Sequence, residues 1–218
     1  MVDQQARYRV ACDVGGTFTD FVLYDETTGA IHIEKCLTTP EDPSRGALSG
    51  LGAFDAIDDR HVALTQRIAH ATTLVANTVI ERKGAKTALL ATRGFRDVLE
   101  LRRHVRVTTY ELWEDPPEPL VPRYLRLPVN ERTYSDGTIL QPVDRGDIEA
   151  IVAILRREGV ESVAIAFLHA YVNSTNERAT AEILGQLMPE VAITTSAAVL
   201  PQIKEYERTS TAVVNAYV

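Results

Sequence analysis

The residues best suited to chemistry lie near the start of the chain, where positions 13–20 read Asp-Val-Gly-Gly-Thr-Phe-Thr-Asp. This stretch separates two apolar runs, residues 8–12 and 21–24. Two strands joined by a Gly-Gly turn would place backbone N–H groups and two threonine hydroxyls around one small concavity. A residue without a side chain lets the main chain come close to a ligand. The same residues also fit a plain tight hairpin with a solvated aspartate, and spacing alone does not separate the two.

Asp13 stands at the end of the first apolar run, beside the turn. A carboxylate in that place suits Mg²⁺, usually through water, because magnesium keeps several of its waters. The sequence shows neither the phosphate-loop pattern Gly-x-x-x-x-Gly-Lys-Ser/Thr nor the dinucleotide pattern Gly-x-Gly-x-x-Gly. The five histidines have no paired ligand spacing either. The turn is therefore the main candidate for ligand binding.

The elements that must position this turn follow from the apolar runs. Runs at 8–12, 18–24 and 30–36, separated by short turns, predict a three-stranded meander. Proline at position 43 begins a modest helix that reaches about residue 54. From residue 67 onward strands alternate with helices, which predicts parallel pairing in an α/β architecture. The strands are expected at 67–71, 86–92, 162–167 and 191–195, and the helices at 73–83, 94–101, 144–158 and 176–188.

Between residues 102 and 142 the pattern loosens into an irregular Pro-rich insertion. Within it, Ser135-Asp136-Gly137 predicts a hairpin turn. Residues 201–218 are expected to be helical or irregular.

A second group of polar residues, His70, Thr72 and Thr73, lies where the strand at 67–71 gives way to a helix. N–H groups at such a point favour anions or a developing oxyanion. Thr72 or Thr73 would equally serve as the helix N-cap, with His70 bonded locally. Gly84 is expected to supply the left-handed residue that ends this helix.

Other arginine and histidine residues can be explained without a functional site. Arginines at 93, 96, 102, 103 and 106 surround His104; they could hold a carboxylate or phosphate, but a solvated surface or a subunit contact explains them too. His169 follows an apolar strand, at a place where ligands often meet parallel sheets. A packed histidine explains this residue equally well.

Composition narrows the class of protein. With 218 residues, 45% apolar and 24% charged, the chain matches an ordinary globular protein. The net charge of -7 argues against a nucleic-acid partner. No apolar run approaches the roughly 18 residues that span a bilayer, and the N-terminus lacks the pattern of a secretion signal. Cys12 and Cys36 lie in strand-like runs and are expected to be reduced thiols. These features predict a cytoplasmic protein with no membrane partner.

The opening motif, together with five later blocks, resembles the hydantoinase A and 5-oxoprolinase family, which includes acetone carboxylase subunits. The later blocks begin with His70-Ala71-Thr72-Thr73, Gly94-Phe95-Arg96-Asp97, Pro119-Leu120-Val121-Pro122-Arg123, Phe167-Leu168-His169 and Glu205-Tyr206-Glu207-Arg208. They follow the family's order from about residue 8 to the last residue. Two positions depart from the family, which usually has glycine at position 71 and tends to have glutamate at position 198.

The resemblance implies an α/β fold, the ribonuclease-H-like half of an actin-type ATPase, with a mixed sheet, an opening meander and flanking helices. It implies ATP and Mg²⁺ as cofactors. The phosphates would be held by the backbone of Gly15, Gly16 and Thr17 and by the hydroxyls of Thr17 and Thr19. Asp13 would orient magnesium-bound water, and Asp20 would cap the hairpin or face the reacting centre. These residues, together with His70, Thr72 and Thr73, are the predicted site.

The resemblance also implies how the chain is divided. We expect a family domain over residues 1–196, with 197–218 beginning a following domain that is absent here. The activity implied is phosphoryl transfer from ATP to a substrate oxygen, followed by hydrolysis of a hydantoin or 5-oxoproline ring. Carboxylation of a ketone, a small-molecule kinase and a non-catalytic or truncated assembly subunit remain open alternatives. A second type of subunit is an expected partner.

Overall fold

The structure is a computed structural model that describes residues 7–39, 42–105, 108–111, 113 and 117–218. The chain divides into two compact units, Met1–Glu81 (unit 1) and Arg82–Val218 (unit 2). The single domain expected over 1–196 differs from this division. Each unit has its own four-stranded sheet, so the two are described separately.

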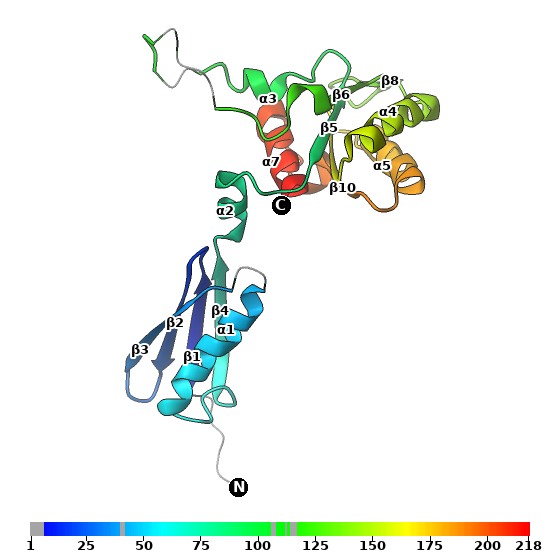
Figure 1. Cartoon of the computed structure of the whole chain (residues 1–218). Coiled ribbons are helices and arrows are strands. Elements are labelled where there is room, and N and C mark those ends of the chain that lie inside the picture. The colour runs from blue at the N-terminus through cyan, green and yellow to red at the C-terminus, as the bar shows by residue number, and fades with distance from the viewer. Residues whose placement is uncertain (1–6, 40–41, 106–107, 112, 114–116) are drawn as a thin grey trace. The chain divides into compact units, whose positions relative to one another are not determined.

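Unit 1 is built on a mixed sheet in the order β3-β2-β1-β4. Its strands are β1 (Tyr8–Val14), β2 (Phe18–Asp25), β3 (Ile31–Leu37) and β4 (Thr65–Thr72). The first three form the antiparallel meander predicted from the apolar runs, and β4 joins β1 in parallel. Figure 1 shows these strands with the turn between β1 and β2 at one end of the sheet.

One face of the unit 1 sheet is covered by α1 (Pro43–Gly52), which continues into a 3₁₀ turn at Ala53–Ala56 (Figure 1). Burial alternates along β1, as expected for a sheet with one covered face. Phe21 on β2 is fully buried, and a Cβ added at Gly50 of α1 would lie 2.1 Å from its ring. The glycine thus lets the helix approach the strand closely.

The helix after β4 is shorter than predicted. It was expected to reach residue 83, but α2 spans only Leu74–Ile80. The left-handed residue that follows is Arg82, with a φ of 56°, and not Gly84. Gly84 serves packing within unit 2 instead, because an added Cβ there would lie 2.3 Å from the carbonyl oxygen of Tyr217. A close contact far along the chain, and not a helix end, requires this glycine.

Unit 2 contains a fully parallel sheet in the order β10-β9-β5-β6. Its strands are β5 (Thr87–Thr92), β6 (Arg126–Val129), β9 (Ser162–Ala166) and β10 (Ala192–Thr195). Every residue of β5 and β9 is buried. Strands buried on both faces are typical of parallel sheets covered by helices.

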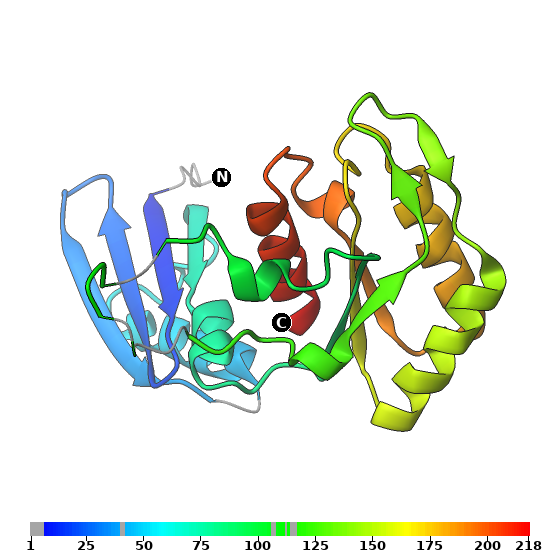
Figure 2. The same cartoon turned by 90° about the horizontal axis from the view of Figure 1, so that it is seen from above.

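Helices cover both faces of this sheet (Figure 2). They are α3 (Val98–Leu101), α4 (Arg145–Glu158), α5 (Thr175–Leu187), α6 (Ser196–Val199) and α7 (Glu205–Tyr217). The predicted ends of α4 are confirmed, since Asp144 accepts a bond from the Asp147 N–H at 3.2 Å and Gly159 adopts a φ of 64°. The helix α7 packs on β9 and β10. Residues 205–217, in the segment expected to begin a following domain, thus pack within unit 2.

The Pro-rich segment holds more regular structure than expected. Besides a 3₁₀ turn at Arg123–Leu125, it contains β6 and the hairpin of β7 (Arg132–Thr133) and β8 (Ile139–Gln141). The predicted turn at residues 135–137 is confirmed, with Gly137 at a φ of 89°. The strand β6 was missed because it contains Pro128. Proline is tolerated there because β6 is an edge strand, which needs hydrogen bonds on one side only.

Within the described residues, no helix has both the length and the apolar character required to cross a membrane.

Candidate functional site

The turn between β1 and β2 is held by bonds from two directions. The Gly15 N–H donates to the Phe18 carbonyl oxygen at 2.9 Å. From the end of β3, the Thr38 hydroxyl donates to the Gly15 oxygen at 2.9 Å, and the Thr38 N–H donates to the Thr17 oxygen at 3.0 Å. The turn is thus fixed in shape before any ligand is considered.

Both glycines of the turn are required by space. A Cβ added at Gly15 would lie 2.8 Å from the Phe18 carbonyl oxygen, and one at Gly16 would lie 2.6 Å from Nδ2 of Asn77. Neither glycine has the positive φ that would demand glycine for conformational reasons. A side chain at position 15 would clash with the main chain of the turn itself, whereas one at position 16 would push against the Asn77 side chain of α2.

The turn presents unpaired donors. In the described part of the chain, the N–H groups of Gly16 and Thr17 and the Thr17 hydroxyl have no hydrogen-bond partner. Both residues are exposed. Successive backbone N–H groups can form a concavity that binds anions. This part of the predicted site has the chemistry that a phosphate group requires.

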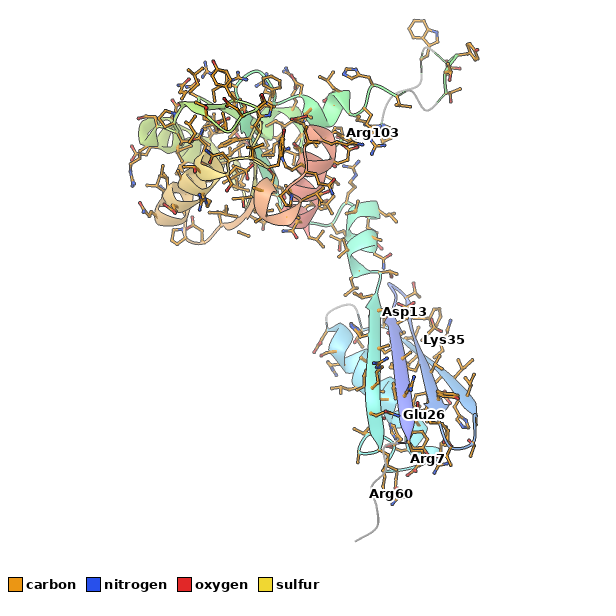
Figure 3. All side chains as sticks on the ribbon, turned by 180° about the vertical axis from the view of Figure 1, so that it is seen from behind. Arg7, Asp13, Glu26, Lys35, Arg60 and Arg103 are labelled. Atoms are coloured by element: carbon orange, nitrogen blue, oxygen red, sulfur yellow. The ribbon has the colours of Figure 1, made fainter. Side chains whose placement is uncertain are left out.

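Two carboxylates lie side by side below the turn. Asp13 on β1 and Asp20 on β2 are direct cross-strand partners, so their side chains share the face that α1 leaves uncovered. Lys35 on β3 pairs with Asp20 at 2.9 Å, and Figure 3 shows Lys35 near Asp13. A cavity of about 210 Å³ adjoins both acids. Its other lining residues are Ala11, Cys12, Val22, Ala69, His70 and Ala71.

This pair of acids fits a hydrated magnesium ion better than a directly ligated one. No cluster of three or more His, Cys, Asp or Glu side chains able to hold a metal occurs among the described residues. Asp20 is already engaged with Lys35, which leaves Asp13 as the available carboxylate. Magnesium commonly keeps most of its waters and needs only one or two carboxylates. Asp13 could therefore hold such an ion through water.

Thr19 lies on the other side of the sheet from these acids. Its side chain is fully buried, and its hydroxyl lies 2.9 Å from the Thr38 hydroxyl. The chain of bonds continues from Thr38 to the Gly15 oxygen. In this arrangement Thr19 supports the turn from below, and a direct bond from Thr19 to a phosphate stays a prediction.

Thr72 and Thr73 tie the end of β4 to the end of β1. The Thr73 N–H donates to the Val14 oxygen at 3.1 Å, and the Thr72 hydroxyl donates to the same oxygen at 3.3 Å. The Thr72 hydroxyl also accepts a bond from the Leu74 N–H at 3.2 Å. The structure thus brings these threonines next to the turn, in structural roles. Thr73 occupies the N-cap position without a side-chain capping bond.

Asn77 was not among the predicted site residues, yet it contacts the turn. Its amide nitrogen lies beside Gly16 and 3.5 Å from the Thr73 hydroxyl. The signal in the sequence was the spacing, because residues 73 and 77 are one helical turn apart and share a helix face. Asn77 therefore joins the turn as a candidate polar contact.

His70 is not brought together with Asp13. In the parallel pairing of β1 with β4, His70 is opposite Cys12, whereas Asp13 is opposite Ala71. Side chains alternate along a strand, so those of His70 and Asp13 lie on opposite faces. Burial raises the pKa of the Cys12 thiol, and neighbouring Cys36 and Asp13 add to the effect. Cys12 is thus a packed thiol. The His70 side chain belongs to the opposite face of the sheet from the acids, although His70 is among the residues that line the cavity beside them.

The mixed sheet with its glycine turn and adjoining acid defines an α/β protein compatible with one half of an actin-type ATPase. The model of the family described as "Hydantoinase/oxoprolinase N-terminal region" matches residues 9–188. This chain belongs to that family.

Several relatives match nearly the whole chain. An uncharacterized protein of Methanocaldococcus jannaschii is 39% identical over 96% of this chain and 31% of its own length. Caprolactamase subunit alpha of Pseudomonas jessenii is 36% identical over 97% of this chain and 31% of its own length. The gamma subunit of acetophenone carboxylase from Aromatoleum aromaticum is 33% identical over 100% of this chain and 32% of its own length. The chain therefore spans about a third of the length of the curated relatives that it matches.

Two solved structures share the fold. The crystal structure of the ATP-dependent caprolactamase from Pseudomonas jessenii matches with a TM-score of 0.84 and 36% identity, covering 97% of this chain and 31% of the other. A nucleotide-free acetone carboxylase matches with a TM-score of 0.84 and 27% identity, covering 97% and 32%.

Proposed function

We propose that this chain is the N-terminal part of an ATP-dependent enzyme that opens the ring of a cyclic amide, and that the β1–β2 turn holds the phosphates of ATP. The observation that carries the proposal is the turn itself: unpaired N–H groups at Gly16 and Thr17, fixed in shape, beside Asp13. The 36% identity with a caprolactamase subunit supports a lactam-type substrate.

The proposed chemistry begins with phosphoryl transfer. The amide oxygen of the substrate attacks the γ-phosphorus, the bond from that phosphorus to the bridging oxygen breaks, and ADP leaves. The amide carbon is then more electrophilic, so water adds to it, and the C–N bond of the ring breaks as the nitrogen takes up a proton. The acyl phosphate that remains is hydrolysed by a second water, which releases phosphate and leaves the ring-opened amino acid. The protein contributes positioning and charge neutralisation. Backbone N–H groups of the turn would bind phosphate oxygens, and Asp13 would orient magnesium-bound water.

Assembly with a second type of subunit belongs to the same proposal. The relatives from Pseudomonas and Aromatoleum are both named as subunits of their enzymes. The polypeptide corresponding to the rest of their length would supply the remainder of the nucleotide and substrate sites. We also retain the prediction that four further residues lie at or near the reacting centre: Asp20, His70, Thr72 and Thr73.

The binding step can be tested on this chain by calorimetry with Mg-ATP. We expect Gly16→Ala to weaken binding by tenfold or more, roughly 1.4 kcal/mol, because the added Cβ stands where a phosphate would approach the main chain and also pushes against the Asn77 side chain. Gly52→Ala is the matched control, since its Cβ would lie 3.9 Å from the nearest atom. Asp13→Asn should reduce the dependence on magnesium. Equal binding by the Gly16 variant and the control would contradict a phosphate site in the turn.

A double variant separates packing from ligand approach. In Gly16→Ala/Asn77→Ala the clash with the Asn77 side chain is gone. Restored ATP binding would mean that Gly16 matters by letting Asn77 pack against the turn. Binding that stays weak would mean that the phosphate itself needs the bare main chain at Gly16.

The reaction is tested after this chain has been combined with the polypeptide that corresponds to the remaining length of the relatives and with their second type of subunit. Caprolactam, 5-oxoproline and acetone are the probes. We expect one ADP for each ring-opened amino acid, and loss of both with Asp13→Asn. Bicarbonate-dependent consumption of the ketone would instead favour the carboxylase alternative, which the 33% identity to an acetophenone carboxylase subunit keeps open.

A further inference from the structure

The segment after β3 contributes a threonine that belongs to none of the motifs in the sequence. Thr38 follows the last residue of β3 and is buried. Its backbone N–H donates to the Thr17 carbonyl oxygen at 3.0 Å, and its hydroxyl donates to the Gly15 carbonyl oxygen at 2.9 Å. One residue at the end of β3 therefore holds the carbonyl oxygens on either side of Gly16.

The direction of each hydroxyl proton near the turn follows from the bonding partners. A hydroxyl has one proton to donate, and a carbonyl oxygen can only accept. The Thr38 hydroxyl donates its proton to the Gly15 oxygen, so it must be the acceptor in its 2.9 Å contact with the Thr19 hydroxyl. Thr19 is then the donor in that contact, and its proton is not available to a ligand. Thr19 and Thr38 thus form a chain of two hydroxyls that ends on the main chain of the turn.

The bond from Thr38 to Gly15 also fixes the direction of the next N–H group. The Gly15 oxygen and the Gly16 N–H belong to one peptide unit, which is planar and trans, so they point in opposite directions. Because the Gly15 oxygen points toward Thr38, the Gly16 N–H points away from it. That N–H has no partner among the residues that the structure describes, and Gly16 is exposed. The Thr38 hydroxyl therefore orients this donor without touching a ligand.

Two glycines in succession make such a hold necessary. Neither Gly15 nor Gly16 has a Cβ to limit φ and ψ, so the peptide unit between them can turn over at little steric cost. In the turned-over state the Gly15 oxygen would take the place of the Gly16 N–H, and an acceptor would face the phosphate. Donors stabilise negative charge best when they are fixed in place beforehand. The glycines that let a phosphate approach thus also need a group that fixes their shared peptide.

The strand end that carries Thr38 is itself held by α1. The Gly46 N–H, in the first turn of α1, donates to the Thr39 hydroxyl at 3.1 Å. A Cβ added at Gly46 would lie 3.4 Å from the Leu37 carbonyl oxygen and 3.4 Å from the Thr39 backbone nitrogen. The helix and the strand end are therefore in close contact. We expect the backbone of Thr38 to stay in place when only its hydroxyl is removed.

We propose that Thr38 is a positioning residue for phosphate binding. Its hydroxyl, supported by that of Thr19, holds the Gly15–Gly16 peptide with the Gly16 N–H directed toward the phosphate. This inference rests on the proposed function, in which the β1–β2 turn holds the phosphates of ATP. It assigns Thr19 to the support of the turn, as the donor to Thr38, in place of a direct contact with phosphate. Loss of the Thr38 hydroxyl weakens nucleotide binding because it frees this peptide.

The test is calorimetry of this chain with Mg-ATP. Thr38→Val removes the hydroxyl and keeps the branched shape at Cβ, and we expect it to weaken binding by about tenfold. Thr38→Ser restores the hydroxyl and should bind within about twofold of the wild type. Thr65→Val is the matched control and should leave binding unchanged. The Thr65 hydroxyl also donates to a carbonyl oxygen, that of His61 at 2.7 Å, but at the end of β4 that is remote from the turn.

A second readout follows the peptide itself, with no nucleotide present. In the ¹⁵N-labelled chain, the nuclear Overhauser effect between the Gly15 Hα protons and the Gly16 amide proton depends on ψ of Gly15, which changes when the peptide turns over. We expect its intensity to change in Thr38→Val and to stay the same in Thr38→Ser and Thr65→Val. An unchanged amide spectrum in the rest of unit 1 verifies the fold. If the valine variant does not fold, Thr38→Ala removes the same hydroxyl in a smaller side chain.

The outcomes separate this inference from the proposed function. A wild-type chain that does not bind Mg-ATP contradicts the ATP site in the turn, and with it the role of Thr38. If the wild type binds, equal affinity in Thr38→Val and its control overturns the role of Thr38 alone. An Overhauser effect that Thr38→Val leaves unchanged does the same. Binding as weak in Thr38→Ser as in Thr38→Val also overturns it, because the hydroxyl would then not be the group that matters.

Discussion

The two units contain sheets of equal strand number but very different burial. In unit 2, helices lie on both faces, and every residue of β5 and β9 is buried. In unit 1, α1 covers one face only, and the parallel strand β4 is exposed along nearly its whole length. Parallel strands are normally buried on both faces. Within the described residues of each unit, unit 2 therefore covers both faces of its sheet with its own helices, whereas unit 1 covers only one face of its sheet.

Replacing one isoleucine with alanine in each unit should give the largest difference in stability between the units. Ile165→Ala in β9 removes a fully buried side chain, and we expect it to lower the free energy of unfolding of unit 2 by about 2–5 kcal/mol. Ile33→Ala in β3 removes a side chain that is 70% exposed, and we expect a change within about 0.5 kcal/mol. Hydrogen exchange resolved by unit measures both. A comparable loss at Ile33 would mean that this face is covered in solution.

Turn glycines should behave alike in both units, since backbone strain is local. Gly159 and Gly29 have φ values of 64° and 74°, and a Cβ at either position would meet no atom within 4 Å. Replacing either with alanine should cost about 1–2 kcal/mol through strain alone. Gly185→Ala, in α5 and equally uncrowded without a positive φ, should stabilise by about 0.5–1 kcal/mol. Urea unfolding checks all three. Unequal costs at Gly159 and Gly29 would contradict the local explanation.

Acidification should change the stability of the two units in opposite directions. Because each change comes from a single titrating group, it is the smallest of the expected effects. The Arg7 guanidinium holds the pKa of Asp25 well below its usual range. The stability that Asp25 gives unit 1 is thus present above the ordinary aspartate pKa of about 3.9 and is lost as the pH falls below it. Burial raises the pKa of Glu131. Its contribution to unit 2 is full below the ordinary glutamate pKa of about 4.3 and is lost as the pH rises through the raised value.

The matched variants for this pH effect are Asp25→Asn and Glu131→Gln, each of which removes one titration. Hydrogen exchange across pH 3 to 7 should show a flatter profile in the unit that carries the substitution and an unchanged profile in the other. A pH profile of unit 2 that Glu131→Gln does not alter would show that another group governs it.

Local patterns were enough to predict most elements. The meander followed from alternating apolar residues, and the ends of α4 from Asp144 and Gly159, because caps and turns depend on neighbours in sequence. The same reasoning failed for β6, whose Pro128 is acceptable only on an edge strand. It also misassigned Gly84, which is required by the distant Tyr217.

The candidate site likewise contains features that the sequence predicted and features that only the structure showed. The turn glycines and Asp13 could be identified from their order along the chain. The separation of His70 from Asp13 depends on the register between β1 and β4, two strands more than fifty residues apart. The contact of Asn77 with Gly16 depends on how α2 packs against the turn. Pairings of this kind leave no periodic signal in the sequence.

The sequence by itself determined the family, the alternating elements and the residue types that could bind a phosphate, because these depend on composition and short spacings. Only the tertiary structure decided which side chains meet. It divided the chain at Glu81, placed Thr19 beneath the turn, and brought Thr92 of β5 to the loop of His169 after β9. The physical reason is that strand order and register are set by burial and pairing between distant segments, which no local pattern specifies.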